Sequence, residues 1–259
     1  MKKITTILFI FSAFIANAQR TIFTSQNNYV APSAAAFQAP AIVTTDLLLN
    51  LDAENPGSYP GNGGNIWYDL STNVNNGTIS TNTMANTAST PKKFTFNGTS
   101  GNNVSFVSSK FNVPYTGKTV IVAAKMYANF GTSLFRALFG NNGNRNFNFY
   151  IYQNGSGYQL HFSAGSWGLS DVLSLTTGQW YIFAASQDAT TIRYYVNGVL
   201  VGTTTGTSVQ QFQSSTNEFL GNADNYWLGE INTALIYKRG LSTAEILQNF
   251  NELKSRFGL

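Results

Sequence analysis

Asn146-Phe-Asn-Phe-Tyr-Ile-Tyr152 is the stretch of sequence that decides the fold. Phe147, Phe149 and Ile151 fall on one side of it, and the more polar residues between them fall on the other. Successive side chains of a β-strand point to opposite faces, so this period of two predicts a strand with one face in a hydrophobic core.

A second stretch, Ile192-Arg-Tyr-Tyr-Val-Asn-Gly-Val-Leu-Val201, predicts a β-hairpin. Its Asn197-Gly198 dipeptide supplies the two positive φ angles of a type I′ turn. Similar short runs rich in β-forming residues, separated by Gly, Asn, Ser and Thr, continue over residues 45–259. This spacing is typical of a sandwich of antiparallel sheets, and we interpret residues 45–259 as one domain.

Only the C-terminus has a helical pattern. Ser242-Thr-Ala-Glu245 has the spacing of a capping box, in which the serine and glutamate side chains bind the first free amides of a helix. Ile246, Phe250 and Leu253 then recur on one helical face, and the pattern runs on to Phe257. We therefore expect an all-β, two-sheet antiparallel sandwich with one C-terminal helix over residues 242–257.

The N-terminus has the three parts of an export signal. Lys2 and Lys3 precede an apolar run, Ile7–Ile15, and Ala16-Asn-Ala18 follows as a cleavage site. We interpret residues 1–18 as a signal peptide and residues 19–44, which lack any period, as a leader or linker. The mature protein is then exported, to the medium, the cell surface or the periplasm. No stretch predicts a membrane-spanning helix.

Composition excludes several classes of function. Charged residues make up 10% of the chain, with no run of Lys or Arg, so we expect no binding to nucleic acid. The formal net charge of +4 includes the two lysines of the signal peptide, which leaves +2 without them. The chain has no cysteine, which excludes a cysteine nucleophile and cysteine-bound zinc.

An ordered set of motifs resembles the laminin G-like jelly-roll domains of bacteria and phages, over roughly residues 46–259. These motifs are Leu47–Gly61, Trp67–Thr78, Phe96–Thr99, Tyr194–Gly198 and Gly229–Ile246. The resemblance implies a concanavalin A-like jelly roll whose members bind glycans, proteins or other surface ligands, often with a structural calcium ion. Where members often have an acidic residue after a glycine-hydrophobic pair, this chain has Glu230, Ile231 and Asn232, so a metal ligand from this segment is not expected.

Residues for catalysis are sparse. A glycosidase needs two carboxylates that flank the sugar bond, and only Asp52 and Glu54 have the spacing that a strand would require. His161 is the only histidine, and no nucleophile elbow accompanies it. Gln159-Leu-His161 is similar to a motif of jelly-roll alginate lyases, but their other motifs are missing. We interpret His161 as a polar residue on a strand face, and the protein as a non-enzyme.

One loop has the oxygen-rich composition that calcium favours. Asp69, Asn73 and Asn76 are its candidate ligands, with Gly77 close by. Asn and Asp are equally typical of turns held by their own backbone hydrogen bonds. Both interpretations, a structural calcium site and a turn without a metal, stay open.

Aromatic residues in polar loops are the remaining signal. Trp167 lies in Ser163–Gly168, and Tyr226 and Trp227 follow Asn222-Ala-Asp-Asn225. Aromatic rings stack on sugars while amides and arginines bind hydroxyl groups, which adds Asn141 and Arg145 as candidate ligand-binding residues. We predict a binding module, for a polysaccharide or cell-surface glycan. The alternative is a protein-interaction, adhesion or structural module, and a glycoside hydrolase or polysaccharide lyase comes third.

Overall fold

The computed structural model describes residues 41–61, 63–81, 83–86, 88–128, 134–141, 148–155, 157–163, 167–206, 209, 217–222 and 225–259. The chain divides into two compact units, Met1–Ala39 and Pro40–Leu259. The predicted signal peptide and most of the predicted leader lie outside the described residues.

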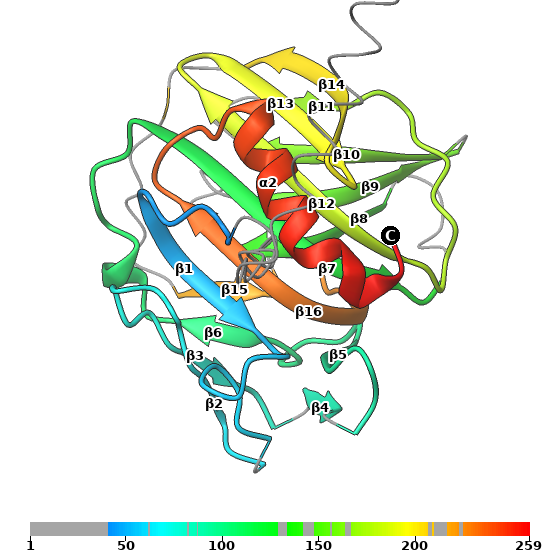
Figure 1. Cartoon of the computed structure of the whole chain (residues 1–259). Helices are drawn as coiled ribbons and strands as arrows, with labels where there is room; N and C mark the ends of the chain where they lie inside the picture. Colours follow the sequence, from blue (N-terminus) through cyan, green and yellow to red (C-terminus); the bar gives the residue numbers. More distant parts are fainter. Residues whose placement is uncertain are drawn as a thin grey trace, which may run out of the picture. The chain divides into compact units, whose positions relative to one another are not determined.

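Most of the regular secondary structure of the unit Pro40–Leu259 is β-strand (Figure 1). They are β1 (Leu47–Asp52), β2 (Ile66–Trp67), β3 (Gly77–Ile79), β4 (Met84–Asn86), β5 (Lys93–Asn97), β6 (Val104–Phe106), β7 (Gly117–Met126), β8 (Leu134–Gly140), β9 (Phe149–Asn154), β10 (Gly157–Ser163), β11 (Trp167–Leu169), β12 (Trp180–Asp188), β13 (Thr191–Val196), β14 (Val199–Thr205), β15 (Glu218–Leu220) and β16 (Leu228–Tyr237). The helical elements are η1 (Ser108–Lys110), α2 (Thr243–Leu253) and η2 (Lys254–Phe257).

The strands form two sheets. Sheet A has the order β14-β13-β12-β7-β16-β5-β4, with β1 also paired to β16, and sheet B has the order β11-β10-β9-β8-β15-β6-β3-β2. The paired strands are antiparallel, as in β7 with β12 and β16. The predicted two-sheet antiparallel jelly roll with one C-terminal helix is confirmed.

The central strand β7 is buried on both faces. Its residues Val120 and Val122 belong to the core between the two sheets. Ile121 and Ala123 alternate with them and belong to a second apolar cluster, on the other face of sheet A. The prediction for β9 is confirmed for Phe149 and Ile151, which are fully buried between the sheets, whereas Phe147 lies outside the described residues.

Helix α2 supplies the cover over this second face of sheet A, across β12, β7 and β16 (Figure 1). The predicted capping box is present, with Ser242 as the N-cap and Glu245 as its partner. Ile246 and Leu253 are buried, and Phe250 packs beside them. The helix ends at Leu253, four residues before the predicted end, because the chain tightens there into η2.

A polar contact fastens the start of the unit to this helix. Asn249, fully buried on α2, accepts a hydrogen bond from the backbone N–H of Val43 (2.8 Å) and donates to the hydroxyl of Tyr237 (3.1 Å). The Tyr237 hydroxyl in turn donates to the Val43 carbonyl (2.9 Å). Val43, in the stretch interpreted as a leader, is therefore buried against the helix.

The predicted hairpin joins β13 and β14. Asn197 has φ 51° and Gly198 has φ 76°, as a type I′ turn requires. The side chain of Asn197 also accepts a hydrogen bond from the N–H of Ile182 (2.9 Å), which ties the turn to β12.

We predict that Ile246→Ala lowers the free energy of unfolding by about 2–5 kcal/mol, because it removes a buried side chain and leaves a cavity under α2. Leu247→Ala, at the neighbouring position where the side chain is 45% exposed, is the matched control and should change it by less than about 0.5 kcal/mol. Thermal or urea unfolding measures both. Equal effects of the two substitutions would contradict the docking of the helix through Ile246.

Candidate functional site: the uncharged face of sheet B

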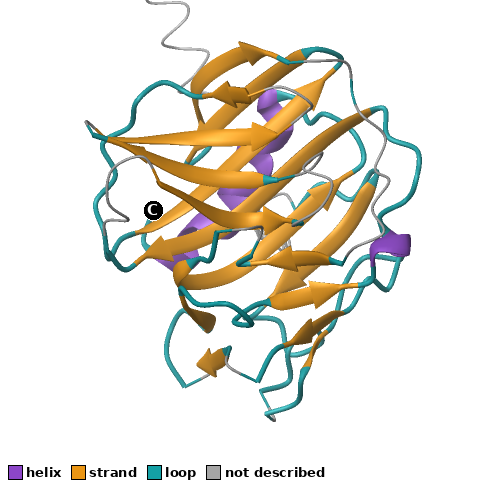
Figure 2. Cartoon of the chain, turned by 180° about the vertical axis from the view of Figure 1, so that it is seen from behind, coloured by secondary structure: helices purple, strands orange, loops and turns teal. Residues whose placement is uncertain are grey.

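The outward face of sheet B lacks charged side chains at its described strand positions. We call it the uncharged face. The cross-strand registers and the core residues between them assign its members, which are Ile66, Thr78, Ser105, Phe135, Ala137, Tyr150, Tyr152, Asn154, Gln159, His161, Ser163, Leu169 and Phe219. In Figure 2 the strands of sheet B lie toward the viewer, with α2 behind sheet A.

A row of three partly exposed residues crosses β8, β9 and β10 on this face. Phe135 pairs with Tyr152, which pairs with Gln159. The rings of Phe135 and Tyr152 stack, with centroids 4.4 Å apart. The Gln159 amide is held in place, since it accepts from Asn154 and donates to the Ser170 carbonyl, both at 2.7 Å. The row therefore combines flat rings with a fixed amide.

A second row beside it is buried. His161 pairs with Tyr150, and the rings of Tyr150 and Phe135 lie against the imidazole, with centroids 5.6 Å and 5.5 Å away. Burial lowers the pKa of His161 to about 4, so the imidazole is neutral at pH 7. His161 lies on a strand face as predicted, and it adds no charge to the surface.

A third row crosses the other half of sheet B. Phe219 pairs with Ser105, Ser105 with Thr78, and Thr78 with Ile66. This row is also free of Lys, Arg, Asp and Glu. A surface of rings, amides and hydroxyls without charge suits a neutral, hydroxyl-rich ligand, because there is no charge to desolvate and each polar group can exchange hydrogen bonds.

The predicted ligand-binding residues are distributed unevenly relative to this face. Trp167 begins β11, and its backbone pairs with Ser163 of the uncharged face. Its side chain lies outside the described part of the structure, as does all of Arg145. Their roles stay predictions.

Trp227 and Asn141 are not surface residues. Trp227 is 0% exposed and lies in the core between the sheets, so the expectation of an exposed ring is wrong. The backbone N–H of Trp227 donates to the Gly221 carbonyl (2.9 Å), which turns the chain inward just before β16. Tyr226 is half-buried, and its carbonyl accepts from Arg136 (3.0 Å).

Asn141 is also 0% exposed, which contradicts its expected place at a loop rim. Its amide donates to Oε1 of Glu218 (2.7 Å), and its backbone N–H donates to the side chain of Asn148 (2.8 Å). Asn141 therefore binds an internal carboxylate and joins the end of β8 to Asn148.

Glu218 and Lys118 are the charged residues that the sequence analysis missed. Both are fully buried, on strands β15 and β7, and their neighbours Leu220 and Val120 face the core between the sheets. Burial raises the pKa of Glu218 to about 8, although Asn141 and Lys118 oppose the shift. Burial lowers the pKa of Lys118 to about 7, against the attraction of Glu218. No local pattern marks either residue as internal.

The loop with the predicted calcium ligands is held by its own hydrogen bonds. Both oxygens of the Asp69 carboxylate accept from the chain, with donors at 2.7–2.8 Å from Asn50, Ser71 and Asn75. Asn76 accepts from the N–H of Asp69 (2.9 Å).

Asn73 uses its amide N–H to bond the Leu47 carbonyl (2.8 Å). The three predicted ligands therefore fasten the loop to β1 and to itself. Hydrogen bonds of this kind are typical of a turn held by Asx side chains. Calcium binding stays a prediction.

The carboxylates with glycosidase-like spacing are occupied. Asp52 Oδ1 binds the guanidinium of Arg256 (2.7 Å), which joins β1 to the C-terminal segment. Glu54 Oε1 accepts from the N–H of Lys92 (2.7 Å). Neither carboxylate is placed as an acid or base facing a ligand.

Glu230 lies in another ionic cluster. It is contacted by Lys125 (2.6 Å), Lys93 (3.3 Å) and the hydroxyl of Tyr127 (2.6 Å). Burial would raise its pKa, but the hydrogen bonds from Lys125 and Tyr127 outweigh burial and hold the pKa below its ordinary value. This acid stabilises sheet A.

The described residues contain no group of three or more His, Asp or Glu side chains placed to hold a metal ion. No helix within them has the length and hydrophobicity needed to cross a membrane.

The chain is a lectin-like jelly-roll domain, as its two antiparallel sheets and the order of their strands define it. Residues 98–247, more than half of the chain, match the family model of the concanavalin A-like lectin/glucanases superfamily. The chain belongs to this superfamily, which confirms the resemblance seen in the sequence. No curated protein sequence matches the chain.

Solved structures with the same fold include binding domains and an enzyme. The binding domain of Paraclostridial Mosquitocidal Protein 1 has a TM-score of 0.59 at 15% identity, covering 80% of this chain and 52% of that one. Domain 4 of AbnA, a GH43 extracellular arabinanase from Geobacillus stearothermophilus, was solved in complex with arabinotriose. It has a TM-score of 0.55 at 18% identity, and the match covers 79% of this chain and 98% of that one. Trypanosoma rangeli sialidase has a TM-score of 0.57 at 15% identity, and the match covers 83% of this chain and 34% of the sialidase. The chain thus spans about half the length of the mosquitocidal protein domain, and identities this low show the fold alone.

We predict that Glu218 makes the protein less stable as the pH rises from about 4.5 to about 8. The pKa of Glu218 is raised in the folded state, so its contribution to stability is complete below the ordinary value of 4.5 and is lost as pH rises through about 8. Glu218→Gln cannot ionise and should lose less stability over this range. Loss of the Glu218 charge also removes the attraction that raises the pKa of Lys118, and this lower Lys118 pKa shifts the comparison in the same direction. Parallel profiles of melting temperature against pH would contradict the buried carboxyl.

We predict that Asp69→Ala lowers the free energy of unfolding by at least about 2 kcal/mol, because four donors lose an ionised acceptor. The loss should be the same with calcium and with chelator if the loop is a turn without a metal. A melting temperature that rises with millimolar calcium in the natural protein, and does not rise in Asp69→Ala, would instead establish the calcium site.

Proposed function

We propose that this protein is a non-catalytic module that binds a neutral polysaccharide on the uncharged face of sheet B. The observation that carries the proposal is the partly exposed row of Phe135, Tyr152 and Gln159 on a face without charged side chains at its described positions. The C–H face of a sugar stacks on rings of this kind, while its hydroxyls bind amides and phenols.

The hydroxyl of Tyr152 is the donor best placed for such a ligand. It makes no hydrogen bond with the described residues, whereas the neighbouring Gln159 amide is already fixed by Asn154 and Ser170. A fixed amide contacts a ligand with little loss of conformational entropy. Trp167, whose strand lies next to this row, is proposed as a further stacking residue.

The arrangement of the carboxylates supports binding without cleavage. Asp52 and Glu54 are engaged by Arg256 and by the backbone of Lys92, and the buried Glu218 lies behind the uncharged face. Hydrolysis of a glycosidic bond needs two carboxyl groups that flank the bond from one cleft. Domain 4 of the arabinanase, which was solved with arabinotriose, makes arabinan the first polysaccharide to test. The pattern of Lys2, Lys3, Ile7–Ile15 and Ala16-Asn-Ala18 supports export to where such polymers occur.

A protein-interaction or adhesion module is the second candidate. Val74 and Val107, both 60% exposed, line a small pocket together with Lys110 and Phe111. Val74 also has φ 54°, a backbone conformation that is strained for a β-branched residue and is often associated with function. Failure to bind any polysaccharide, with binding to a surface protein lost in Val74→Ser, would favour this candidate.

We predict that Tyr152→Ala weakens binding to a neutral polysaccharide by about 1 kcal/mol or more, which is roughly fivefold in Kd. Arabinan, xylan, mannan and a β-glucan are the neutral probes, and pectate and alginate are the charged ones. Affinity electrophoresis or calorimetry measures binding, and reducing-end assays measure cleavage. We expect binding without release of product, and a weaker effect of Tyr152→Phe, which keeps the ring.

The control variant is Tyr127→Ala, which removes a 43% exposed tyrosine at the end of β7 on sheet A. It should leave binding unchanged, and any loss of stability from its hydrogen bond to Glu230 is read from its own melting curve. Three results would each contradict the proposal: product release, preference for the charged polymers, or full binding by a folded Tyr152→Ala.

A further inference from the structure

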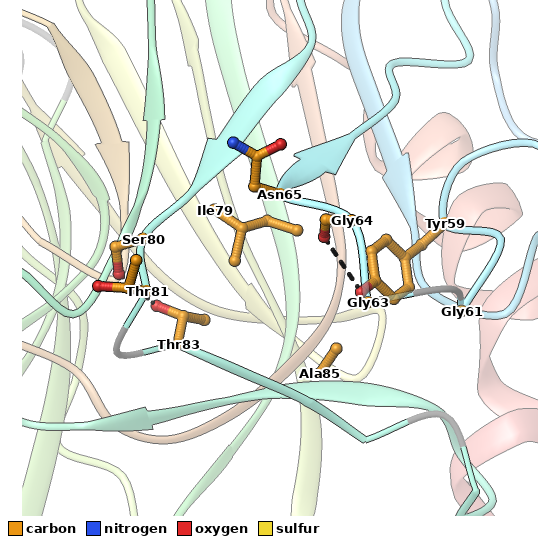
Figure 3. A pocket seen from close by; sticks show the side chains of 10 residues that line it. All are labelled: Tyr59, Gly61, Gly63, Gly64, Asn65, Ile79, Ser80, Thr81, Thr83 and Ala85. Atoms are coloured by element: carbon orange, nitrogen blue, oxygen red, sulfur yellow. Dashed lines mark hydrogen bonds between the residues drawn. The ribbon is translucent and has the colours of Figure 1, made fainter.

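A pocket of about 430 Å³ opens where β2 and β3 of sheet B face β4 of sheet A (Figure 3). Its volume falls within the range of about 300–1,000 Å³ that is typical of small-ligand sites. The described residues that line it are Tyr59, Gly61, Gly63, Gly64, Asn65, Ile79, Ser80, Thr81, Thr83 and Ala85. None of them is charged.

One wall of the pocket is fixed by Tyr59. The tyrosine is 3% exposed, and its ring meets the ring of Phe94 edge to face at 4.9 Å. Its hydroxyl donates to the carbonyl of Gly64 (3.3 Å), which holds the glycine-rich segment over the pocket. Gly63 has φ 76° and open space beside it, so this segment presents backbone groups to a ligand without a side chain in the way.

The opposite wall consists of hydroxyl groups, and Ile79 lies between the two walls (Figure 3). The hydroxyls of Ser80 and Thr83 are 2.9 Å apart. Thr83 also donates to the carbonyl of Asn103 (3.2 Å) and accepts from the amide of Asn102 (3.2 Å). These bonds are made within the protein, so the wall is formed before any ligand arrives.

Two polar side chains at the pocket are left for a ligand. Asn65 and Thr81 are exposed, and their side chains make no hydrogen bonds with the described residues. The site therefore offers an amide, a hydroxyl, exposed backbone and an apolar floor, with no charge. A neutral sugar ring has the matching groups, since it carries hydroxyls around its edge and C–H bonds on its faces.

We propose that this pocket binds one neutral sugar residue, as the end of the polysaccharide chain that lies on the uncharged face. The inference rests on the proposed function, and the topology connects the two sites. Ile66 and Thr78 end the third row of the uncharged face, and the pocket residues Asn65 and Ile79 are their direct chain neighbours. A glycan that follows this row reaches the pocket at the edge of the sheet.

The test uses monosaccharides, which are too short to span the face. D-glucose, D-galactose, D-mannose, L-arabinose and N-acetyl-D-glucosamine are titrated into the protein and followed by NMR or calorimetry, with glucuronic acid as the charged counterpart. Ala85 is exposed and lines the pocket, so we expect Ala85→Trp to fill it, and the melting temperature of this variant checks that the core at its cross-strand partner Phe94 is intact. We expect at least one neutral sugar to bind and Ala85→Trp to weaken it by about tenfold or more.

Matched variants separate the pocket from the face. Ala88→Trp adds the same ring at an exposed position outside the pocket and should bind the sugar normally. The double variant Asn65→Ala, Thr81→Ala should weaken binding of the sugar as Ala85→Trp does, and its melting temperature should be unchanged. Tyr152→Ala should leave monosaccharide binding intact.

The outcomes distinguish the two proposals. If no monosaccharide binds, or if Ala85→Trp binds as tightly as the natural protein, the pocket proposal is overturned, while polysaccharide binding that is lost in Tyr152→Ala leaves the proposed function standing. If glucuronic acid binds better than every neutral sugar, the proposed ligand class is wrong. If neither sugars nor polysaccharides bind, both proposals fail.

Discussion

Burial of β7 and β16 on both faces is the constraint on which the rest of this structure depends. Every residue of β7 except Lys125 is buried, and so is every residue of β16 except Leu228. A strand of this kind needs an apolar layer on each side, because exposed apolar surface costs free energy in proportion to its area. Sheet B supplies one layer, and α2 with η2 supplies the other.

This constraint also explains the polar residues of β16. Glu230 and Asn232 lie within a buried strand and would be costly there without partners. Lys93 and Lys125 neutralise Glu230, and the Asn232 amide donates to the Lys92 carbonyl (2.6 Å). The departure from the family pattern at residues 230–232 is therefore compatible with a structural role, in which an acid holds β5 and β7 against β16.

The sequence was sufficient for elements whose signal is local. The alternation around Phe149, the Asn197-Gly198 turn and the capping box of Ser242 are each set by neighbouring residues, and each was predicted. The short strand β15 was not. β15 contains only Glu218-Phe-Leu220, and it is defined by pairing with β6, more than a hundred residues earlier, and with β8. No periodicity can appear in three residues.

The candidate site was harder to predict for the same reason. The expectation for Trp227 relied on its polar neighbours, whereas its burial is decided by the contact of its backbone with Gly221 and by the core around it. The uncharged face draws its residues from strands between β2 and β11, and no window of sequence contains it. The sequence contains one sign of this outward face of sheet B, which is the alternation of Tyr150 and Tyr152 with Phe149 and Ile151.

The distribution of charge connects the fold to the proposed ligand. Arg256 joins the C-terminal segment to Asp52 of β1, and Arg239 binds Glu245 between the end of β16 and α2. Other ion pairs, such as Lys125 with Glu230, lie within sheet A. A chain with 10% charged residues that uses them in this way has few left for the outward side of sheet B. The proposed recognition of a neutral ligand on this face relies on shape, ring stacking and hydrogen bonds, which salt screens only weakly.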